Sequence, residues 1–281
     1  MMGVEMRHYT WTDGKTLTLG ERPLIMGILN VTADSFSDGG QWNTVAKAIA
    51  HMEEMIRDGA DIIDIGAESS RPGFTPISAV EEINRLSRFL PDVLAHSTVP
   101  VSVDTFKAET AEYAMSLGAH IMNDIWGLQY AKEPGKMAKV AAKYNVPVIV
   151  MHNQDTTDYG DLLLDMKKFF RTSVEIAVKA GVDPSRIITD PGIGFFGKTT
   201  EQNIYIIKHL HEFTALPYPL LLGPSRKGFI GDVLDLPVTE RLEGTGAVCV
   251  SGVLRGASII RVHDVKPIKR MCIMAEVLKE K

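Results

Sequence analysis

The fold of this chain is decided by the stretch DGADIIDI at residues 58–65, in which a glycine leads directly into an apolar run. The same layout recurs as LGAHIM at 117–122 and as RGASII at 255–260. Glycine at the end of a helix adopts the left-handed conformation without steric cost and turns the chain into the next element. The repetition therefore predicts a series of helix-to-strand units.

Short apolar runs of this kind alternate with helix-like segments from residue 24 to the end of the chain. Each run is nearly continuous in Val, Ile, Leu and Met, which is typical of parallel strands covered on both faces. Eight runs are present, at 24–29, 61–65, 100–103, 119–122, 147–151, 186–189, 219–222 and 258–261. Helical periodicity between them predicts helices at 44–58, 78–95, 107–117, 161–180, 201–213 and 239–254.

Eight strand–helix units predict an α/β fold of the (β/α)8 TIM-barrel class. An open dinucleotide-binding sheet is disfavoured, because no G-x-G-x-x-G sequence follows the first strand. Residues 8–20 predict a short β-hairpin that turns at Asp13-Gly14 and covers the amino-terminal end of the barrel. No linker interrupts the pattern, so residues 1–281 are expected to form a single domain.

Composition and charge exclude several classes of function. The net charge is −5 and the basic residues are scattered, so the chain lacks the basic stripe that nucleic-acid binding needs. No stretch reaches the roughly 18 apolar residues of a membrane span, and the amino terminus lacks the apolar region of a signal peptide. Cys249 and Cys272 have no metal-ligand spacing and are interpreted as buried thiols in a reducing compartment. We expect a cytoplasmic protein with no nucleic-acid or membrane partner.

Polar residues follow every predicted strand. In barrels of this class the catalytic groups come from the carboxyl ends of the strands and the loops after them. These ends carry Asn30, Asp64 with Glu68 and Arg71, Asp104, Asn123 with Asp124, His152, Asp190, Ser225 with Arg226 and Lys227, and Arg261 with His263. A single Asp or Asn at a strand end is as often a helix cap, and Asp104 and Asp190 allow that interpretation. Eight polar ends at one mouth favour an active site.

The residue types divide the predicted site into two halves. One half offers acceptors for a flat heterocycle rich in N–H donors, with a lysine that can donate to a ring carbonyl or nitrogen: Asp104, Asn123, Asp190 and Lys227. The other half is a cationic and amide set suited to an oxyanion such as phosphate: Asn30, Arg71, Arg261 and His263. Neither His152 nor His263 has a nucleophile beside it in sequence, which disfavours covalent catalysis.

Eight sequence motifs resemble the pattern of the dihydropteroate synthase family, in which (β/α)8 barrels bind a pterin. In order, they are MGILNVTADSFSDGG at 26–40, ESSRPG at 68–73, SVDT at 102–105, NDIWG at 123–127, VMHNQD at 150–155, DPGIGF at 190–195, GPSRKGFIG at 223–231 and RVHDV at 261–265. The resemblance implies a transferase of folate biosynthesis. Such an enzyme joins p-aminobenzoate to 6-hydroxymethyl-7,8-dihydropterin pyrophosphate and gives dihydropteroate and pyrophosphate.

The resemblance also implies a role for each matching position. The pterin-binding positions are Asp104, Asn123, Asp190, Lys227 and Ile125. The pyrophosphate-binding positions are Asn30, Arg71, Arg261 and His263, and Asn30 is also the position next to a Mg²⁺ cofactor. The p-aminobenzoate-binding positions are Ser70, Phe195, Phe196, Ser225 and Lys227. Loops 31–42 and 67–77 match those that order over pyrophosphate, and the family forms homodimers through helices near the carboxyl terminus.

Three positions depart from the usual family pattern. Ser70 replaces a threonine and loses a methyl group, and Ala33 replaces a proline. The segment 190–198 is one residue longer than usual, as in the sulfonamide-resistant branch of the family, which carries an inserted Phe-Gly there. We expect Phe196-Gly197 to admit p-aminobenzoate while hindering sulfonamides, which are bulkier at the sulfonyl end. The alternative is a neutral change in loop length.

Two other functions fit part of the pattern. A pterin-dependent methyltransferase shares the Asp and Asn that bind the pterin, but it does not need the SRK and RVHD sequences, and both are intact at 225–227 and 261–264. A pterin-binding paralogue without catalysis predicts damage at Asn30, Arg71 or His263, and all three are present.

Overall fold

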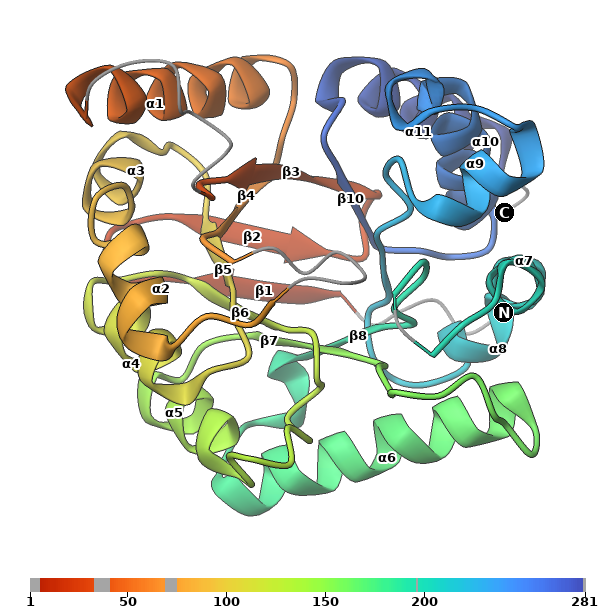
Figure 1. Ribbon diagram of the computed structural model, residues 1–281, viewed down its shortest axis with the longest axis horizontal. Helices are drawn as coiled ribbons and strands as arrows, with labels where there is room; N and C mark the ends of the chain where they lie inside the picture. Colours follow the sequence, from red (N-terminus) through yellow and green to blue (C-terminus); the bar gives the residue numbers. More distant parts are fainter. Residues whose placement is uncertain (1–5, 33–40, 69–74, 196, 280–281) are drawn as a thin grey trace.

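The computed structural model describes residues 6–32, 41–68, 75–195 and 197–279 (Figure 1). Parallel strands form one sheet in the order β8-β7-β6-β5-β4-β3-β10-β9. They are β3 (Leu24–Asn30), β4 (Ile62–Gly66), β5 (Val101–Asp104), β6 (Ile121–Asp124), β7 (Val148–Met151), β8 (Ile187–Asp190), β9 (Leu221–Leu222) and β10 (Ile259–Val262). A parallel bridge between Thr189 and Leu220 joins the first strand in this order to the last. The sheet is therefore closed into a barrel, which confirms the predicted fold class.

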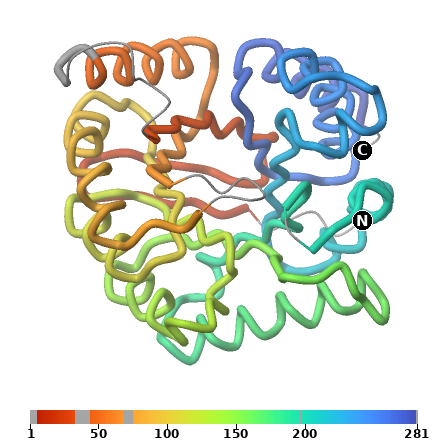
Figure 2. Tube along the Cα trace, viewed as in Figure 1, coloured from red at the N-terminus to blue at the C-terminus, as the bar shows by residue number. Residues whose placement is uncertain are grey.

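Helices surround the barrel and follow one another around it in chain order (Figure 2). They are α1 (Gln41–Arg57), α2 (Ala79–Leu86), α3 (Leu90–His96), α4 (Ala108–Ser116), α5 (Lys136–Tyr144), α6 (Leu162–Ala180), α7 (Thr200–Lys208), α8 (His211–Thr214), α9 (Gly228–Leu234), α10 (Leu242–Leu254) and α11 (Val265–Leu278), with 3₁₀ turns at Pro184–Arg186 and Val238–Glu240. Within the described part of the chain, none of these helices has both the length and the apolarity needed to cross a membrane.

Two of the predicted helices are each split in two. The segment 78–95 forms α2 and α3, and 201–213 forms α7 and α8. Ser78 caps α2 by accepting a hydrogen bond from the backbone N–H of Glu81. The break before α3 follows from Pro91 in its first turn, because proline has no N–H to donate and its ring clashes with the carbonyl four residues earlier.

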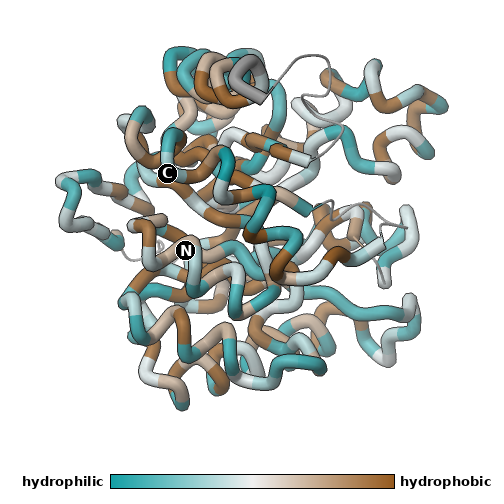
Figure 3. The backbone as a smooth tube through the Cα atoms, turned by 60° about the vertical axis from the view of Figure 1, so that its left-hand side comes forward, coloured by the Kyte–Doolittle hydropathy of each residue, from teal (hydrophilic) through white to brown (hydrophobic). Residues whose placement is uncertain are grey.

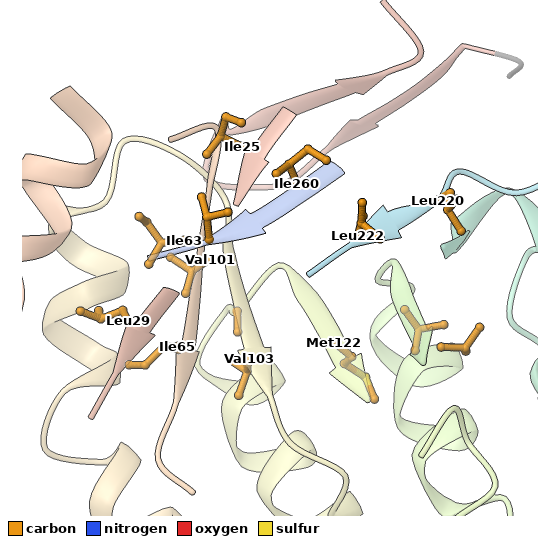
Figure 4. Packing of buried hydrophobic residues seen from close by; sticks show 14 of the residues in the cluster. Ile25, Leu29, Ile63, Ile65, Val101, Val103, Met122, Leu220, Leu222 and Ile260 are labelled. Carbon is orange, nitrogen blue, oxygen red and sulfur yellow. The ribbon is translucent and has the colours of Figure 1, made fainter. Parts of the chain in front are cut away.

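The strands are buried on both faces, as their continuous apolar runs predict. Inward-facing residues such as Leu24, Met26 and Ile62 form one cluster inside the barrel. Their neighbours along the same strands, such as Ile25 and Ile63, face the helices and belong to a larger outer cluster (Figure 4). Hydrophobic stretches accordingly follow the central strands in Figure 3. Alternate residues of one strand thus stabilise two separate layers of the core.

The predicted hairpin is confirmed by the antiparallel strands β1 (Arg7–Thr10) and β2 (Thr16–Leu19). Gly14 has φ +86° in the connecting turn, a conformation that glycine adopts readily. Leu17 and Leu19 join the inner cluster, and Arg7 donates to the carbonyl oxygen of Ile187 at 2.9 Å. Because Ile187 begins strand β8, the hairpin covers the amino-terminal end of the barrel. A substrate must therefore enter from the opposite end.

Candidate active site

The predicted site residues that the structure describes lie in the last two residues of barrel strands, within them, or in the loops that follow. Asn30, Asp104 and Asp190 are the last residues of β3, β5 and β8, Asn123 is near the end of β6, and Arg261 lies in β10. Those in the following loops are Ile125, Phe195, Ser225, Lys227 and His263. Ser70, Arg71 and Phe196 lie outside the described residues, as do most of the predicted loops 31–42 and 67–77. The barrel topology therefore gathers the two predicted halves at one mouth.

Arg261 connects the ends of three strands. Its Nε donates to Asp64 Oδ2 at 2.6 Å and its Nη2 donates to Asp104 Oδ2 at 2.7 Å. The side-chain amide of Asn123 donates to the same Asp64 oxygen at 3.1 Å. Arg261 was expected in the pyrophosphate half, yet here it contacts Asp104, a carboxylate of the pterin half. The two halves therefore meet at this guanidinium.

Asp64 is a functional candidate to which the sequence motifs assign no role. It is fully buried in β4, and its Oδ1 has no hydrogen-bond partner among the described residues. Asp64 fixes the orientation of both Arg261 and Asn123, so it acts on the site although the family motifs give it no ligand contact. The signal in the sequence is a charged residue inside the apolar run IIDI, because a buried charge requires partners.

Burial perturbs three carboxyl groups at the mouth. It raises the pKa of Asp104 to about 7, because desolvation outweighs the attraction of Arg261. It raises the pKa of Asp190 to about 6, against the opposing hydrogen bond from the backbone N–H of Gly192. The pKa of Asp124 is likewise raised to about 6. A ligand that brings N–H donors to Asp104 and Asp190 would stabilise their ionised forms.

The capping interpretation applies to some of these residues and not to others. Asp124 accepts hydrogen bonds from the backbone N–H groups of Trp126 and Leu128, both at 2.8 Å, so it stabilises the loop after β6. Asp190 accepts one such bond from Gly192 at 2.7 Å. Asp104 instead faces Arg261. Asp124 is thus a structural cap, whereas Asp104 belongs to the site.

A buried apolar cluster forms one wall of the mouth. It contains Phe106, Ile125, Met151 and Phe195, with Trp126 and Tyr130 packed against it. The ammonium nitrogen of Lys227 lies 3.7 Å from the centroid of the Phe195 ring, a cation–π contact. Sequence reasoning identified Ile125 and Phe195 but missed Phe106 and Met151, because hydrophobic residues beside a strand carry no distinguishing pattern. The wall offers a flat aromatic substrate an apolar face.

Ser225 and His263 form a hydrogen-bonded pair. The two side chains are joined by a 2.9 Å hydrogen bond between Ser225 Oγ and His263 Nδ1. Ser225 Oγ also accepts the backbone N–H of His263 at 3.1 Å, so its own proton can be donated to Nδ1. A neutral His263 then carries its proton on Nε2. Ser225, expected beside p-aminobenzoate, is therefore engaged with a member of the pyrophosphate set.

The loop that carries Ser225 and Lys227 is braced from two sides. Arg226, with φ +56°, makes a bidentate ion pair with Asp264 at 2.9 and 2.6 Å. The guanidinium of Arg241 donates to the carbonyl oxygens of Arg226 and Lys227 at 3.2 and 3.3 Å. These bonds hold the backbone before α9 in one position, so the two functional side chains are preorganised.

His152, a candidate at the end of β7, is a structural residue. Its ring packs against that of Phe169, with 4.8 Å between the centroids. Burial lowers the pKa of His152 to about 2, so the imidazole is neutral at physiological pH. Lys198 donates to the backbone oxygen of His152 at 3.2 Å, which ties the loop after β8 to that after β7.

The described residues contain no group of three His, Cys, Asp or Glu side chains that could hold a metal ion. Asn30, half-buried at the end of β3, can offer one amide oxygen. Magnesium prefers oxygen ligands and retains water or binds substrate phosphates. This chemistry fits an ion carried by a phosphorylated substrate, and it does not fit an ion caged by described protein groups.

Comparison with known proteins identifies the family. Residues 26–263 match the pterin binding enzyme family. The dihydropteroate synthase of Bacillus subtilis (strain 168) is 51% identical over 270 residues, which are 96% of this chain and 93% of that protein. The chain belongs to the dihydropteroate synthases. The resemblance of its eight motifs to this family is thereby confirmed.

Two solved structures of the family are similar along almost their whole length. That of the Clostridium difficile dihydropteroate synthase in the presence of pteroic acid has a TM-score of 0.89 and 45% identity, covering 94% of this chain and 99% of that one. That of the Xanthomonas albilineans enzyme with 4-aminobenzoic acid has a TM-score of 0.88 and 38% identity, covering 96% and 97%.

Proposed function

We propose that this chain condenses p-aminobenzoate with 6-hydroxymethyl-7,8-dihydropterin pyrophosphate and releases 7,8-dihydropteroate and pyrophosphate, a transfer reaction of folate biosynthesis. The observation that carries the proposal is the convergence of Asp104, Asn123, Asp190 and Arg261 at the open end of the barrel. The pteroic acid and 4-aminobenzoic acid in the two related structures support it.

The pterin ring is assigned to the buried acceptors. Asp104, Asn123 and Asp190 offer oxygens to the N–H groups of the ring, and Lys227 donates to a ring carbonyl or nitrogen. Ile125 belongs to the apolar wall and contacts a face of the ring. In a site shielded from water, each of these hydrogen bonds discriminates strongly against a ring without the matching group.

Pyrophosphate is assigned to the cationic half. Arg261 and His263 Nε2 donate to its oxygens, and Arg71, outside the described residues, adds a second guanidinium. His263 directly precedes Asp264, the residue before α11, and the amino terminus of a 14-residue helix favours an anion. When the anion binds, it offers Arg261 a second set of acceptors besides Asp64 and Asp104.

The p-aminobenzoate ring is assigned to the space beside Phe195 and Lys227. The aromatic face of Phe195 already holds the Lys227 ammonium at 3.7 Å, so a cation lies next to a flat surface. Such a pair suits an aromatic carboxylate. Ser70 and Phe196 complete the proposed set from outside the described residues, and Ser225 joins it through its position beside His263.

The reaction breaks the bond between the methylene carbon and the pyrophosphate oxygen, and the electron pair leaves with pyrophosphate. The dihydropterin ring stabilises the cationic methylene group, and the neutral amine of p-aminobenzoate forms the new C–N bond and then loses a proton. Hydrogen bonds from Arg261 and His263 stabilise the charge that develops on the leaving group. Positioning of the two substrates supplies the remaining rate, and a strong general base is not required.

Asn30 would hold a magnesium ion that is carried by pyrophosphate. When bound, the ion would neutralise charge on the leaving group. Asn30, Arg261 and His263 are all assigned to this anion.

A homodimer is proposed through α11. Four apolar side chains of this helix are 52–73% exposed: Ile273, Met274, Val277 and Leu278. A contiguous exposed apolar face on a helix is typical of a protein interface. Sedimentation equilibrium tests the proposal, and a monomer at micromolar concentration would contradict it.

The two cysteines are free thiols, which fits the proposed cytoplasmic location.

Reduced sulfonamide sensitivity is proposed to result from the extra residue of segment 190–198, at Phe196-Gly197. Gly197 has φ +72°, and an added Cβ would lie 2.5 Å from the backbone oxygen of Gln154, so Gly197 packs closely on the loop after β7. Inhibition constants for sulfamethoxazole test the proposal in this chain and in a form lacking Phe196. Equal, tight inhibition of both would refute it.

The function itself is tested by coupled detection of pyrophosphate. Release that requires both p-aminobenzoate and the pterin pyrophosphate is expected, with Mg²⁺ present. A pterin-binding protein without catalysis would release none at saturating substrates.

A further inference from the structure

A buried ion-pair network lies beside the mouth of the barrel, outside the residues assigned to substrates. Lys107 Nζ is 2.5 Å from Glu68 Oε2 and 3.0 Å from Glu82 Oε2, and the three side chains are 9%, 7% and 0% exposed. Thr110 also donates to Glu82 Oε2 at 3.0 Å. Charges removed from water are tolerated only in well-defined geometry with additional hydrogen bonds. The network therefore fixes the relative positions of the elements that carry it.

Glu68 connects the two ends of the segment between β4 and α2. While its Oε2 contacts Lys107, its Oε1 accepts the backbone N–H of Ile77 at 2.7 Å. A single carboxylate thus joins residue 68 to residue 77. Residues 69–74 lie outside the described residues, and the bond fixes Glu68 and Ile77, the described residues on either side of them, relative to each other.

Lys107 connects the same carboxylate to the pterin half of the site. It precedes α4 and follows Asp104, the end of β5, by three residues. Its ammonium lies 4.5 Å from the centroid of the Phe106 ring, which belongs to the apolar wall of the mouth. Lys107 therefore bridges the end of β5 and the ends of the 68–77 segment.

We propose that Glu68 and Lys107 are positioning residues, which hold the ends of the 68–77 segment at a fixed place relative to Asp104. In the sequence, Arg71, which the family pattern assigns to pyrophosphate, lies between these two ends. The inference rests on the proposed function. Neither side chain is among those assigned to a substrate. Loss of this connection should therefore impair transfer while leaving the binding of the pterin ring intact.

The substitution Glu68→Ala tests this, because it removes the connection and leaves the buried Lys107–Glu82 pair in place. We expect kcat/KM for the pterin pyrophosphate to fall at least tenfold. The Kd of 6-hydroxymethylpterin, which lacks pyrophosphate, should change less than twofold in calorimetric titration. Glu68→Gln keeps an acceptor for the N–H of Ile77 but loses the ion pair with Lys107, because an amide nitrogen cannot accept from an ammonium group, so kcat/KM should lie between those of Glu68→Ala and the original chain.

Lys269→Met is the matched control. Lys269 shares Asp61 with Arg22 in another three-membered network, at the amino-terminal end of the barrel, with a Lys269–Asp61 distance of 3.0 Å. Like Glu68→Ala, this substitution removes one member of a three-membered network, and it leaves the Arg22–Asp61 ion pair in place. We expect kcat/KM within twofold of the original chain.

Unchanged kcat/KM in Glu68→Ala would overturn the proposal, as would a parallel loss of pterin affinity. If circular dichroism shows that Glu68→Ala is unfolded, Glu68→Asp tests the proposal instead. It keeps the charge but is one methylene too short to reach both partners, so kcat/KM should fall at least threefold, and the original value would overturn the proposal. Absence of activity in the unsubstituted chain would instead contradict the proposed function.

Discussion

Arg261 is the residue at which the site's electrostatics are concentrated. Its guanidinium contacts Asp64 and Asp104, and only the second of these carboxylates was predicted as a ligand contact. Strand-end residue types sufficed to predict Asp104, Asn123, Asp190 and Arg261, because the order of a parallel barrel brings all its carboxyl ends together. The Asp64 contact could not be predicted, because side-chain orientation inside a barrel depends on packing across strands that are distant in sequence.

The raised pKa values of Asp104 and Asp190 predict pH-dependent ligand binding. The N–H donors of a pterin bind the ionised carboxylates, so protons must be lost before binding at low pH. We expect the affinity for 6-hydroxymethylpterin to weaken as pH falls from 8 to 5.5, by up to about tenfold per pH unit for each protonated carboxyl. Calorimetric titration across this range measures it. Equal affinity at pH 8 and 5.5 would contradict the assignment.

Asp104 and Asp190 also make the stability of the folded protein depend on pH. Their folded-state pKa values, about 7 and 6, lie above the unfolded value. Their contribution to stability is therefore fully present below the unfolded pKa, about 3.9, and is lost as pH rises through the folded pKa values. Asp190→Asn should reduce the pH dependence of the free energy of unfolding in the unliganded protein.

Among the elements, strands were predicted better than helices. Continuous apolar runs predicted the barrel strands because burial on both faces leaves a strong signal. The extra helix breaks were missed, although Pro91 accounts for one of them. The loops were predicted only through family motifs, because the conformation of a loop is set by its contacts with other loops. Gly192 is an example: an added Cβ at this residue would lie 2.2 Å from the backbone oxygen of His152.

Gly192→Ala should disrupt the loop after β8. Gly192 has φ +64°, and the new methyl group would collide with backbone and displace Asp190, two residues earlier. Gly118→Ala is the control, because its φ is +95° but nothing lies within 4 Å of an added Cβ. The control should lose only about 1–2 kcal/mol from backbone strain. Thermal unfolding measures both, and an equal fall in Tm would contradict the packing argument.

In the whole molecule, the hairpin and the residues of the proposed site lie at opposite ends of the barrel axis. The hairpin and its contacts cover one end, while the other end carries the polar residues and the buried network of Glu68 and Lys107. This division was predictable from the sequence, because the eight units and the hairpin leave only the carboxyl ends open. The coupling between the two halves of the site became visible only once Arg261 was placed against both carboxylates.

One part of the mouth is proposed to bind the pterin ring, and another part is proposed to bind pyrophosphate. Calorimetric titration of Asp190→Asn and His263→Ala with 6-hydroxymethylpterin and with its pyrophosphate ester, each with Mg²⁺, tests it most directly. Asp190→Asn should weaken both ligands at least tenfold. His263→Ala should weaken only the ester. Equal weakening of both ligands by His263→Ala would contradict the account.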